Sequence, residues 1–447
     1  MRLLGIENPP FDHHHIRQAD TTSIAQFIQN NPTNFLWPKI GWAGADGGVV
    51  ESELPLYAAI TAMGWQIWPQ AGPIWPRVLS IGFWIMGGIG ILRWTKAELI
   101  GPRWPYLLLY SFAPLAIITS RNIQPDSMAL ALVLWGISII DRPRIWTSRS
   151  ALGAILMGLG IAAKGQYFVL LPMIPILLYW RIEPNKNRWA QISLCTGIST
   201  VIPALWYIHA HFNLGANGAS FGVFGAAAQK WGSIEIWLTG ETWLVLLRVA
   251  IMQVLTPLGC GLLLVSVFHR HNSLKAYWLG FGLAFSSWFI LTEGHYIHNY
   301  YQLPMIPFAS ILMGHGLQVL RHNRQSRWLI IGFPLLLIST LSGRQLIRSA
   351  ITVDEKIVLQ ANEINQLLPS KEPIALLARH PQTVLFASGR NGAIGNHYYP
   401  SRQSDYAEMG LKYIVIHSEV MSNVENTILN GFTPHGQWWI QKIEAAD

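Results

Sequence analysis

Long apolar runs alternate with short polar segments through most of the chain. After a short first run at 54–68, ten runs of near-spanning length cover residues 74–94, 104–120, 123–140, 150–163, 165–180, 189–211, 244–268, 275–292, 299–320 and 326–343. A helix needs about 20 apolar residues to cross a bilayer, so several of these runs are short. The pattern predicts a polytopic α-helical membrane protein with about ten spans. The 54–68 run, closed by Pro69, is better explained as an interfacial or re-entrant helix.

The two ends of the chain have a different pattern. Residues 1–53 are mostly polar and turn-rich. We expect residues 1–73 to form a first outer loop with interfacial helices. The bundle is expected over 74–345. Beyond it, an amphipathic helix at 354–368 and short buried strands at 373–378, 383–387, 413–417 and 437–444 predict a small C-terminal α/β domain over 346–447. The two glycines of 389–392 favour a plain tight turn over a phosphate loop.

Composition supports the membrane assignment. Hydrophobic residues make up 51% of the chain and charged residues 12%, roughly half the usual ~25%. The net charge of +8 is compatible with nucleic-acid binding, but the basic residues lie in short loops between apolar runs. That distribution follows the positive-inside rule, so we expect no nucleic-acid partner. Cys195 and Cys260 each lie within an apolar run and are expected to be packing residues.

Loop charges orient the predicted bundle. Alternate loops carry most of the basic residues: Arg93, Lys96 and Arg103; Arg142, Arg144 and Arg149; Arg181, Lys186 and Arg188; Arg270 and Lys275; Arg321, Arg324 and Arg327. The opposite loops carry little more than Arg121, Lys164 and Lys230. The first set is therefore expected in the cytoplasm, and the opening loop, the 212–243 and 293–298 loops and the C-terminal domain outside. An outer N-terminus implies either a helix upstream of residue 1, which we favour, or an unusual insertion.

The candidate chemistry begins in the His13–Thr21 stretch, which we expect in a loop at the membrane surface. Asp20 is a candidate general base, with Arg17 and Gln18 positioning the substrate. A helix N-cap before residues 21–28 is an equally good interpretation of Asp20. The three histidines are candidate metal ligands, but consecutive residues rarely converge on one ion, so a metal site is not favoured. No cofactor is assigned, and a requirement for a divalent metal is left open.

Four further polar groups lie on the same predicted face. Residues 51–57 carry two carboxylates, explained by substrate contacts or by helix-dipole compensation. In residues 121–126, Pro125 suits the first turn of a helix, so Asp126 lies near the start of that helix. We favour a structural or supporting role for Asp126. Lys164 lies in a predicted tight hairpin. It either binds the phosphate of a lipid carrier or extends from a helix end to the membrane surface as a snorkelling lysine. Residues 293–304 combine histidines and tyrosines useful for sugar recognition. The expected substrate-binding residues are His14, His15, Glu51, Glu53, Tyr57, Arg121, Gln124, Asp126, Lys164, Glu293, His295, His298 and Tyr300.

The order of these motifs resembles a known family. Five motifs follow one another over residues 11–320: HHHIRQADTTSIAQF, ELPLY, RNIQPD, KGQYFVLLP and HNYYQLPMIPFASILMGHG. Together they look like the membrane-embedded GT-C glycosyltransferases of the family-39-like group, which includes protein O-mannosyltransferases and the lipid A aminoarabinose transferase. Relatives often carry an Asp-Glu pair in the opening loop, whereas this chain has Arg17-Gln18 and a single Asp20.

The resemblance implies an inverting hexosyl- or pentosyl-transfer from a polyprenyl-phosphate-linked donor. The acceptor would be a lipid, a glycan or a protein at the outer face of a membrane, expected to be the bacterial inner membrane. Asp20 would be the catalytic carboxylate, and Lys164 and Arg121 would lie near the donor phosphate. Two other function classes remain: a transporter or flippase for a lipid-linked sugar, which predicts broken helices at the midplane, and a catalytically inactive binding relative.

Overall fold

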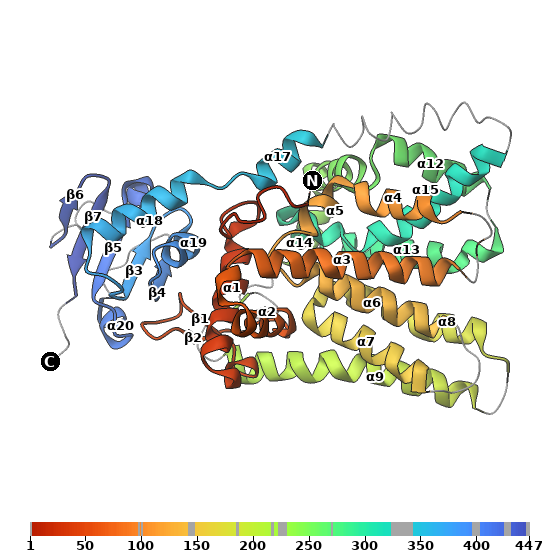
Figure 1. The fold of residues 1–447 in the computed structure, drawn as a ribbon, viewed down its shortest axis with the longest axis horizontal. Helices are drawn as coiled ribbons and strands as arrows, with labels where there is room; N and C mark the ends of the chain where they lie inside the picture. Colours follow the sequence, from red (N-terminus) through yellow and green to blue (C-terminus); the bar gives the residue numbers. More distant parts are fainter. Residues whose placement is uncertain are drawn as a thin grey trace. The chain divides into compact units, whose positions relative to one another are not determined.

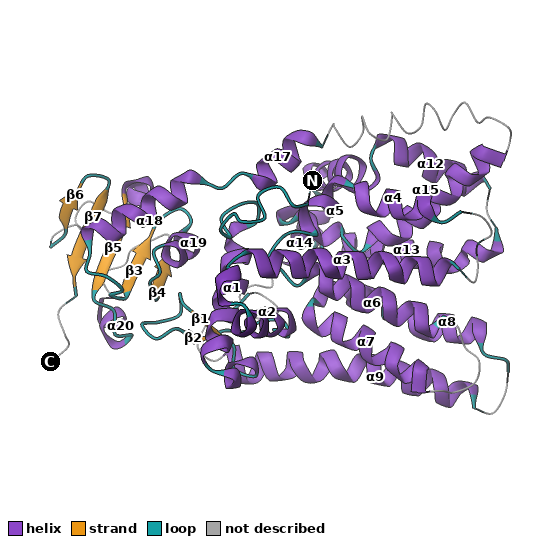
Figure 2. Cartoon of the chain, in the orientation of Figure 1, coloured by secondary structure: helices purple, strands orange, loops and turns teal. Residues whose placement is uncertain are grey.

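The protein is represented by a computed structural model that describes residues 2–96, 99, 102–141, 148–184, 187–215, 219–221, 230–269, 271–322, 343–395, 403–423 and 431–443. The chain divides into two compact units. The first contains residues 1–6, 76–209 and 222–351, and the second contains residues 7–75, 210–221 and 352–447. Figure 1 follows the chain through both, and Figure 2 shows that the strands belong almost entirely to the C-terminal part.

The first unit is helical. Its main helices are α3 (Ile74–Thr95), α4 (Trp104–Phe112), α5 (Pro114–Thr119), α6 (Asp126–Ile140), α7 (Ser148–Ala163), α8 (Met173–Arg181), α9 (Arg188–His209), α10 (Ile234–Leu238), α11 (Gly240–Val249), α12 (Pro257–Phe268), α13 (Lys275–Ile290), α14 (Thr292–Ile297), α15 (Met305–His322) and α17 (Arg344–Ile351). Short helical turns η3 (Gly165–Leu170) and η9 (Asn299–Gln302) precede α8 and α15. Nine of the ten predicted runs coincide with these helices. The tenth, 326–343, lies outside the described residues apart from its last position.

Few of these helices are long enough to cross a bilayer alone. By length and composition, two described helices qualify, Ile74–Thr95 and Arg188–Leu214. A third span results if Gly240–Leu255 and Pro257–Phe268 are counted together, but these are bent by 87° at their junction. The 104–120 run is also divided, because Pro114 starts a separate helix after Ala113. Prolines therefore turn several predicted single spans into pairs of shorter helices.

Close packing within the first unit depends on small residues. A Cβ placed on Gly136 of α6 would lie 2.7 Å from the carbonyl oxygen of Gly153 in α7, so glycine lets these two helices approach closely. Elsewhere, the buried Trp94 ring of α3 packs edge-on against Tyr277 of α13, with ring centroids 4.6 Å apart. The Nε1 of Trp94 donates a 2.6 Å hydrogen bond to Asp141, which also pairs with Arg181 at 2.9 Å.

The second unit combines the N-terminal segment with the α/β region. Its N-terminal part contains α1 (His15–Asn30), α2 (Leu56–Ile67) and a two-stranded ribbon of β1 (Lys39–Ile40) and β2 (Gly48–Val49). Apolar residues of α1, β1 and α2 form one cluster that includes Ile24, Ile40 and Trp65. The far end of α2 is apolar and exposed, with Ile67 at 87%. An interfacial position for this helix stays a prediction.

The α/β region has a five-stranded sheet of order β4-β3-β5-β7-β6. Its strands are β3 (Ile374–Leu377), β4 (Gly392–Gly395), β5 (Tyr413–His417), β6 (Thr433–His435) and β7 (Trp438–Lys442). β3 pairs in parallel with β4 and β5, and β7 is antiparallel to β5 and β6. Alternate residues enter opposite cores, so Leu376 packs with the α18 (Glu355–Leu367) side and Leu377 with the α20 (Gln403–Glu408) side.

The predicted strand at 383–387 is wrong. These residues belong to helix α19 (Pro381–Ala387), which starts with Pro381 in its first turn. The helix connects β3 to β4, and two adjacent parallel strands require such a crossover. A short apolar run cannot be assigned to strand or helix by periodicity alone, which explains the error. The other predicted elements, at 354–368, 373–378, 413–417 and 437–444, are confirmed as α18, β3, β5 and β7.

Candidate functional site

From His15 onward the His13–Thr21 stretch is helical, which corrects the prediction of a loop. Helix α1 begins at His15, and His14 occupies the N-cap position with a left-handed φ of 59°. Asp20 lies in the second turn of this helix, so it is no N-cap. Ala19, Ile24 and Ala25 are buried on the helix, but so are Gln18 and Asp20. Buried polar residues weaken the apolar periodicity by which a sequence predicts a helix.

Asp20 is a buried carboxylate that forms one hydrogen bond with the residues that the structure describes. Its side chain is 5% exposed, and its Oδ1 accepts a 2.9 Å hydrogen bond from the indole Nε1 of Trp42. Burial raises the pKa of Asp20 to about 6, although the nearby positive charge of Arg17 and the Trp42 hydrogen bond oppose that increase. A carboxylate with a pKa near neutrality is well matched to accepting a proton from a hydroxyl group.

The side chains of Arg17 and Gln18 bind the carboxylates of Glu53 and Asp12, not that of Asp20. Arg17 pairs with Glu53 at 2.7 Å, and its guanidinium lies 4.4 Å from the ring centre of Phe221. The Nε2 of Gln18 donates to Asp12 at 2.5 Å and to the carbonyl oxygen of His13 at 2.8 Å. Both side chains therefore fix the local structure around α1.

The 51–57 segment is also tied to its neighbours. The buried Glu51 accepts a hydrogen bond from Ser220, and its backbone N–H donates to Ala219 at 2.9 Å. Tyr57 is buried in α2. Glu51 and Glu53 precede helix α2, whose N-cap is Pro55 and whose first turn contains no acidic residue.

The three histidines lie at the start of α1, where His13 and His14 contact each other and His15 contacts other residues. The Nδ1 of His15 lies 2.8 Å from the hydroxyl of Thr383, and burial together with the charge of His380 lowers the pKa of His15 to about 4. The rings of His13 and His14 are 4.0 Å apart. Among the described residues, no group of three or more His, Cys, Asp or Glu side chains is arranged to hold a metal ion.

In the first unit, Lys164 and Asp126 form a buried pair. The Nζ of Lys164 lies 3.8 Å from Oδ2 of Asp126, with side-chain exposures of 3% and 1%. The same ammonium lies 4.9 Å from the ring centre of Tyr300. Asp126 is in the first turn of α6, as expected, and the hydroxyl of Tyr167 joins η3 to α6 by a hydrogen bond of 3.3 Å to the Asp126 carbonyl oxygen. The buried position of Lys164 disfavours the snorkelling alternative.

Neighbouring residues add buried polar groups to this region. Arg121 donates to the carbonyl oxygens of Ala350 at 3.0 Å and Gly5 at 2.8 Å. The Nε2 of Gln124 and both side-chain polar atoms of Asn122 are buried and make no hydrogen bond to any described residue. Orphaned amides are rare in folded proteins and often indicate a missing water, ion or ligand.

The 293–304 segment packs around tyrosine rings. His295 is buried, with its Nε2 2.8 Å from the hydroxyl of Ser287. His298 stacks on Tyr300 with ring centres 5.0 Å apart. Tyr300 thereby links His298 to Lys164. Glu293 is half-buried and makes no hydrogen bond or ion pair with another described residue.

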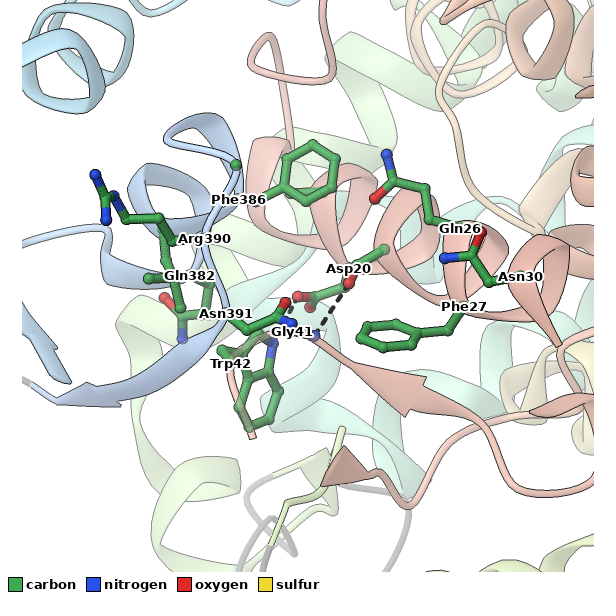
Figure 3. A pocket seen from close by; sticks show the side chains of 14 residues that line it. Asp20, Gln26, Phe27, Asn30, Gly41, Trp42, Gln382, Phe386, Arg390 and Asn391 are labelled. Carbon is green, nitrogen blue, oxygen red and sulfur yellow. Dashed lines mark hydrogen bonds between the residues drawn. The ribbon is translucent and has the colours of Figure 1, made fainter. Parts of the chain in front are cut away.

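A cavity of about 320 Å³ opens beside Asp20 within the second unit. Figure 3 shows Asp20 and Trp42 at its centre, with side chains of α1 on one side and of the 382–391 segment on the other. Sequence reasoning missed Trp42, Asp12 and Ser220, each of which binds a predicted site residue. Trp42 and Ser220 lie far along the chain from the residues that they bind, and none of the three belongs to a recognisable motif.

The fold is similar to that of solved membrane enzymes. Two crystal structures of ArnT from Cupriavidus metallidurans match, each covering 96% of this chain and 94% of that chain. The apo structure matches with a TM-score of 0.64 and 14% identity, and the one bound to undecaprenyl phosphate with 0.60 and 13%. The Archaeoglobus fulgidus oligosaccharyltransferase in complex with Zn and sulfate matches with 0.50 and 13%, covering 94% of this chain and 66% of its own.

Sequence comparison adds nothing to this result, since no family model and no curated protein sequence matches the chain significantly. The structural match extends over both the helical unit and the unit that contains the sheet. At 13–14% identity it establishes the architecture, and the activity has to be argued from the residues. The chain has the GT-C fold of membrane glycosyltransferases.

Proposed function

We propose that the protein is a glycosyltransferase that moves a single sugar from a polyprenyl-phosphate-linked donor to an acceptor at the outer face of a membrane. The observation that carries the proposal is Asp20, a carboxylate buried in a GT-C fold and held at a pKa of about 6. A buried carboxylate is costly to keep, so its retention in a polar cavity favours a chemical role.

The donor class is supported by a fold neighbour and by basic and amide residues of the first unit. One ArnT structure of the same fold is bound to undecaprenyl phosphate. A phosphate leaving group needs positive charge and hydrogen-bond donors. Lys164 carries a buried ammonium beside Tyr300 and pairs with Asp126, which follows the orphaned amides of Asn122 and Gln124 along the chain. Lys164 and Arg121 are the proposed ligands of the donor phosphate.

The proposed chemistry balances without any further reagent. The acceptor hydroxyl oxygen attacks the anomeric carbon of the donor sugar, and the bond from that carbon to the phosphate oxygen breaks. Polyprenyl phosphate leaves with the bonding electrons, and the hydroxyl proton passes to the Asp20 carboxylate. Arg17 holds the Asp20 pKa below what burial alone would give, so that the base stays ionised near neutral pH. Inversion at the anomeric carbon follows from direct displacement.

The active site is proposed to lie at the outer membrane face and to recognise its substrates through acidic, histidine and tyrosine side chains. The basic loops expected in the cytoplasm support an active face on the outer side, in an integral protein of a bacterial inner membrane. The transferred sugar is a hexose or a pentose. Glu51, Glu53, His295, His298 and Tyr300 are proposed to contribute to recognition.

An assay of donor consumption tests the proposal against the two alternatives. Purified protein in lipid vesicles is incubated with radiolabelled polyprenyl-phosphate hexose or pentose and a cell-envelope extract as the acceptor source. Release of free polyprenyl phosphate with transfer of label supports the enzyme. Movement of intact donor across the vesicle membrane indicates a flippase, and binding without either change indicates an inactive relative. The last two outcomes contradict the proposal.

A further inference from the structure

The cavity beside Asp20 is lined by amide and aromatic side chains. Its amides are Gln26 and Asn30 from α1, Gln382 from α19 and Asn391 from the turn before β4. Three aromatic side chains, Phe27, Trp42 and Phe386, complete most of the wall. Figure 3 shows the amides arranged around Asp20 from both sides. The volume of about 320 Å³ is at the small end of the ligand-pocket range of roughly 300–1,000 Å³.

The hydrogen-bonding capacity of this wall is largely unused inside the protein. None of the four amide side chains forms a hydrogen bond with another described residue. Asp20 uses Oδ1 for Trp42, and no described residue donates to its Oδ2. The half-buried Gln382 lies in helix α19 and the half-buried Asn391 lies directly before strand β4, and these fixed positions favour a specific ligand over loosely held solvent.

The charged side chains in the cavity wall indicate which class of ligand the cavity binds. Arg390 is in the cavity wall, but its guanidinium donates to Asn365 at 3.2 Å and to the carbonyl oxygens of Pro369 at 2.8 Å and Glu372 at 2.9 Å. Figure 3 shows this guanidinium directed away from Asp20. The cavity therefore offers one carboxylate and no available cation among its lining residues, which disfavours phosphate or sulfate groups.

We propose that this cavity binds one or two neutral sugar units. Amide groups both donate to and accept from hydroxyls, and flat aromatic rings pack against the apolar faces of pyranoses. The volume, the unused amides and the absence of an available cation among the lining residues together fit such a ligand. Because Asp20 is part of the wall, the bound sugar is the acceptor of the transfer, and this last step rests on the proposed function.

Binding to a glycan array tests the cavity directly. The full chain, purified in detergent, is applied to immobilised neutral, amino-substituted and sulfated or phosphorylated glycans. We expect binding to neutral glycans, weakened at least 10-fold in Gln382→Leu and Asn391→Leu. Asn362→Leu, on the exposed face of α18, is the matched control and should bind as the wild type does. Gln26→Ala, at an exposed position of α1, serves if a Leu variant fails to fold.

The outcomes separate the cavity from the proposed reaction. Absence of neutral-glycan binding, preference for anionic glycans, or equal binding by the cavity variants would each overturn the inference. Glycan binding that depends on the cavity, in a protein that never consumes donor, would refute the proposed function and leave a glycan-binding site. Donor consumption with wild-type kinetics in Gln382→Leu would refute the acceptor assignment alone.

Discussion

The indole Nε1 of Trp42 donates a 2.9 Å hydrogen bond to Oδ1 of Asp20, and this contact joins the β1–β2 ribbon region to the buried face of α1. A hydrogen bond to the ionised carboxylate stabilises the charged form and so lowers the pKa. It opposes the larger effect of burial, and the balance leaves the pKa of Asp20 at about 6. Trp42 thereby helps to set the pH at which Asp20 becomes a base.

Trp42→Phe should raise the pKa of Asp20, because the hydrogen bond that favours the carboxylate is lost. A hydrogen bond to a charged group contributes about 1.5–3 kcal/mol, so the acidic limb of the pH–rate profile should move up by about one pH unit or more. The measurement is kcat/KM for the donor between pH 5 and 9. Trp68→Phe, at an exposed position, is the control. An acidic limb unchanged in Trp42→Phe would show that Asp20 does not control the rate.

Asp20→Asn should stabilise the fold while strongly slowing transfer. The folded pKa of about 6 exceeds the reference value of 3.8, so the folded state binds the proton more tightly than the unfolded state. The wild type therefore loses stability as the pH rises from about 4 to above 6, by an amount of about 3 kcal/mol. The neutral amide avoids this loss. Thermal unfolding should show the Asp20→Asn variant more stable than the wild type at pH 7 and nearly equal at pH 4, and a lower stability at pH 7 would contradict the account.

Lys164→Met should weaken donor binding and also destabilise the protein, because Asp126 would remain buried beside an apolar side chain. Adding Asp126→Asn to Lys164→Met should restore most of the lost stability. Donor binding should stay weakened by about 10- to 100-fold, the equivalent of one charge-assisted contact. Equilibrium binding of undecaprenyl phosphate measures this effect. A double variant that folds and binds undecaprenyl phosphate normally would remove Lys164 from the donor site.

Ser220→Ala should cost about 1–3 kcal/mol of folding free energy. Glu51 is buried and accepts a hydrogen bond from Ser220, so losing the hydroxyl leaves a carboxylate oxygen unsatisfied. Glu51→Gln should cost less, since a neutral amide is cheaper to bury. Denaturant unfolding measures both variants. An equal loss in the two would indicate that the Glu51 charge has no part in the effect.

The sequence predicted most helices of the first unit and the strands β3, β5 and β7, but it misassigned α19 as a strand and did not reveal the surroundings of the carboxylates. Apolar runs correctly located the helices of the first unit, and β3 and β5 followed from short buried runs. The first turns of helix α1 were missed because Gln18 and Asp20 are buried among its apolar residues. The partners Trp42 and Ser220 come from segments 22 and 169 positions away from Asp20 and Glu51, and no local pattern encodes such pairing.

The most direct test of the central claim compares the wild type with Asp20→Asn in release of free polyprenyl phosphate from a radiolabelled polyprenyl-phosphate sugar. Both proteins are purified in the same detergent and checked by thermal unfolding, so that equal amounts of folded protein are compared. The account predicts release and sugar transfer by the wild type, with the rate falling about 1,000-fold in the variant, within the roughly 10²–10⁴-fold range of general base catalysis. Equal rates in the two proteins, or no release by the wild type with any donor sugar, would contradict it.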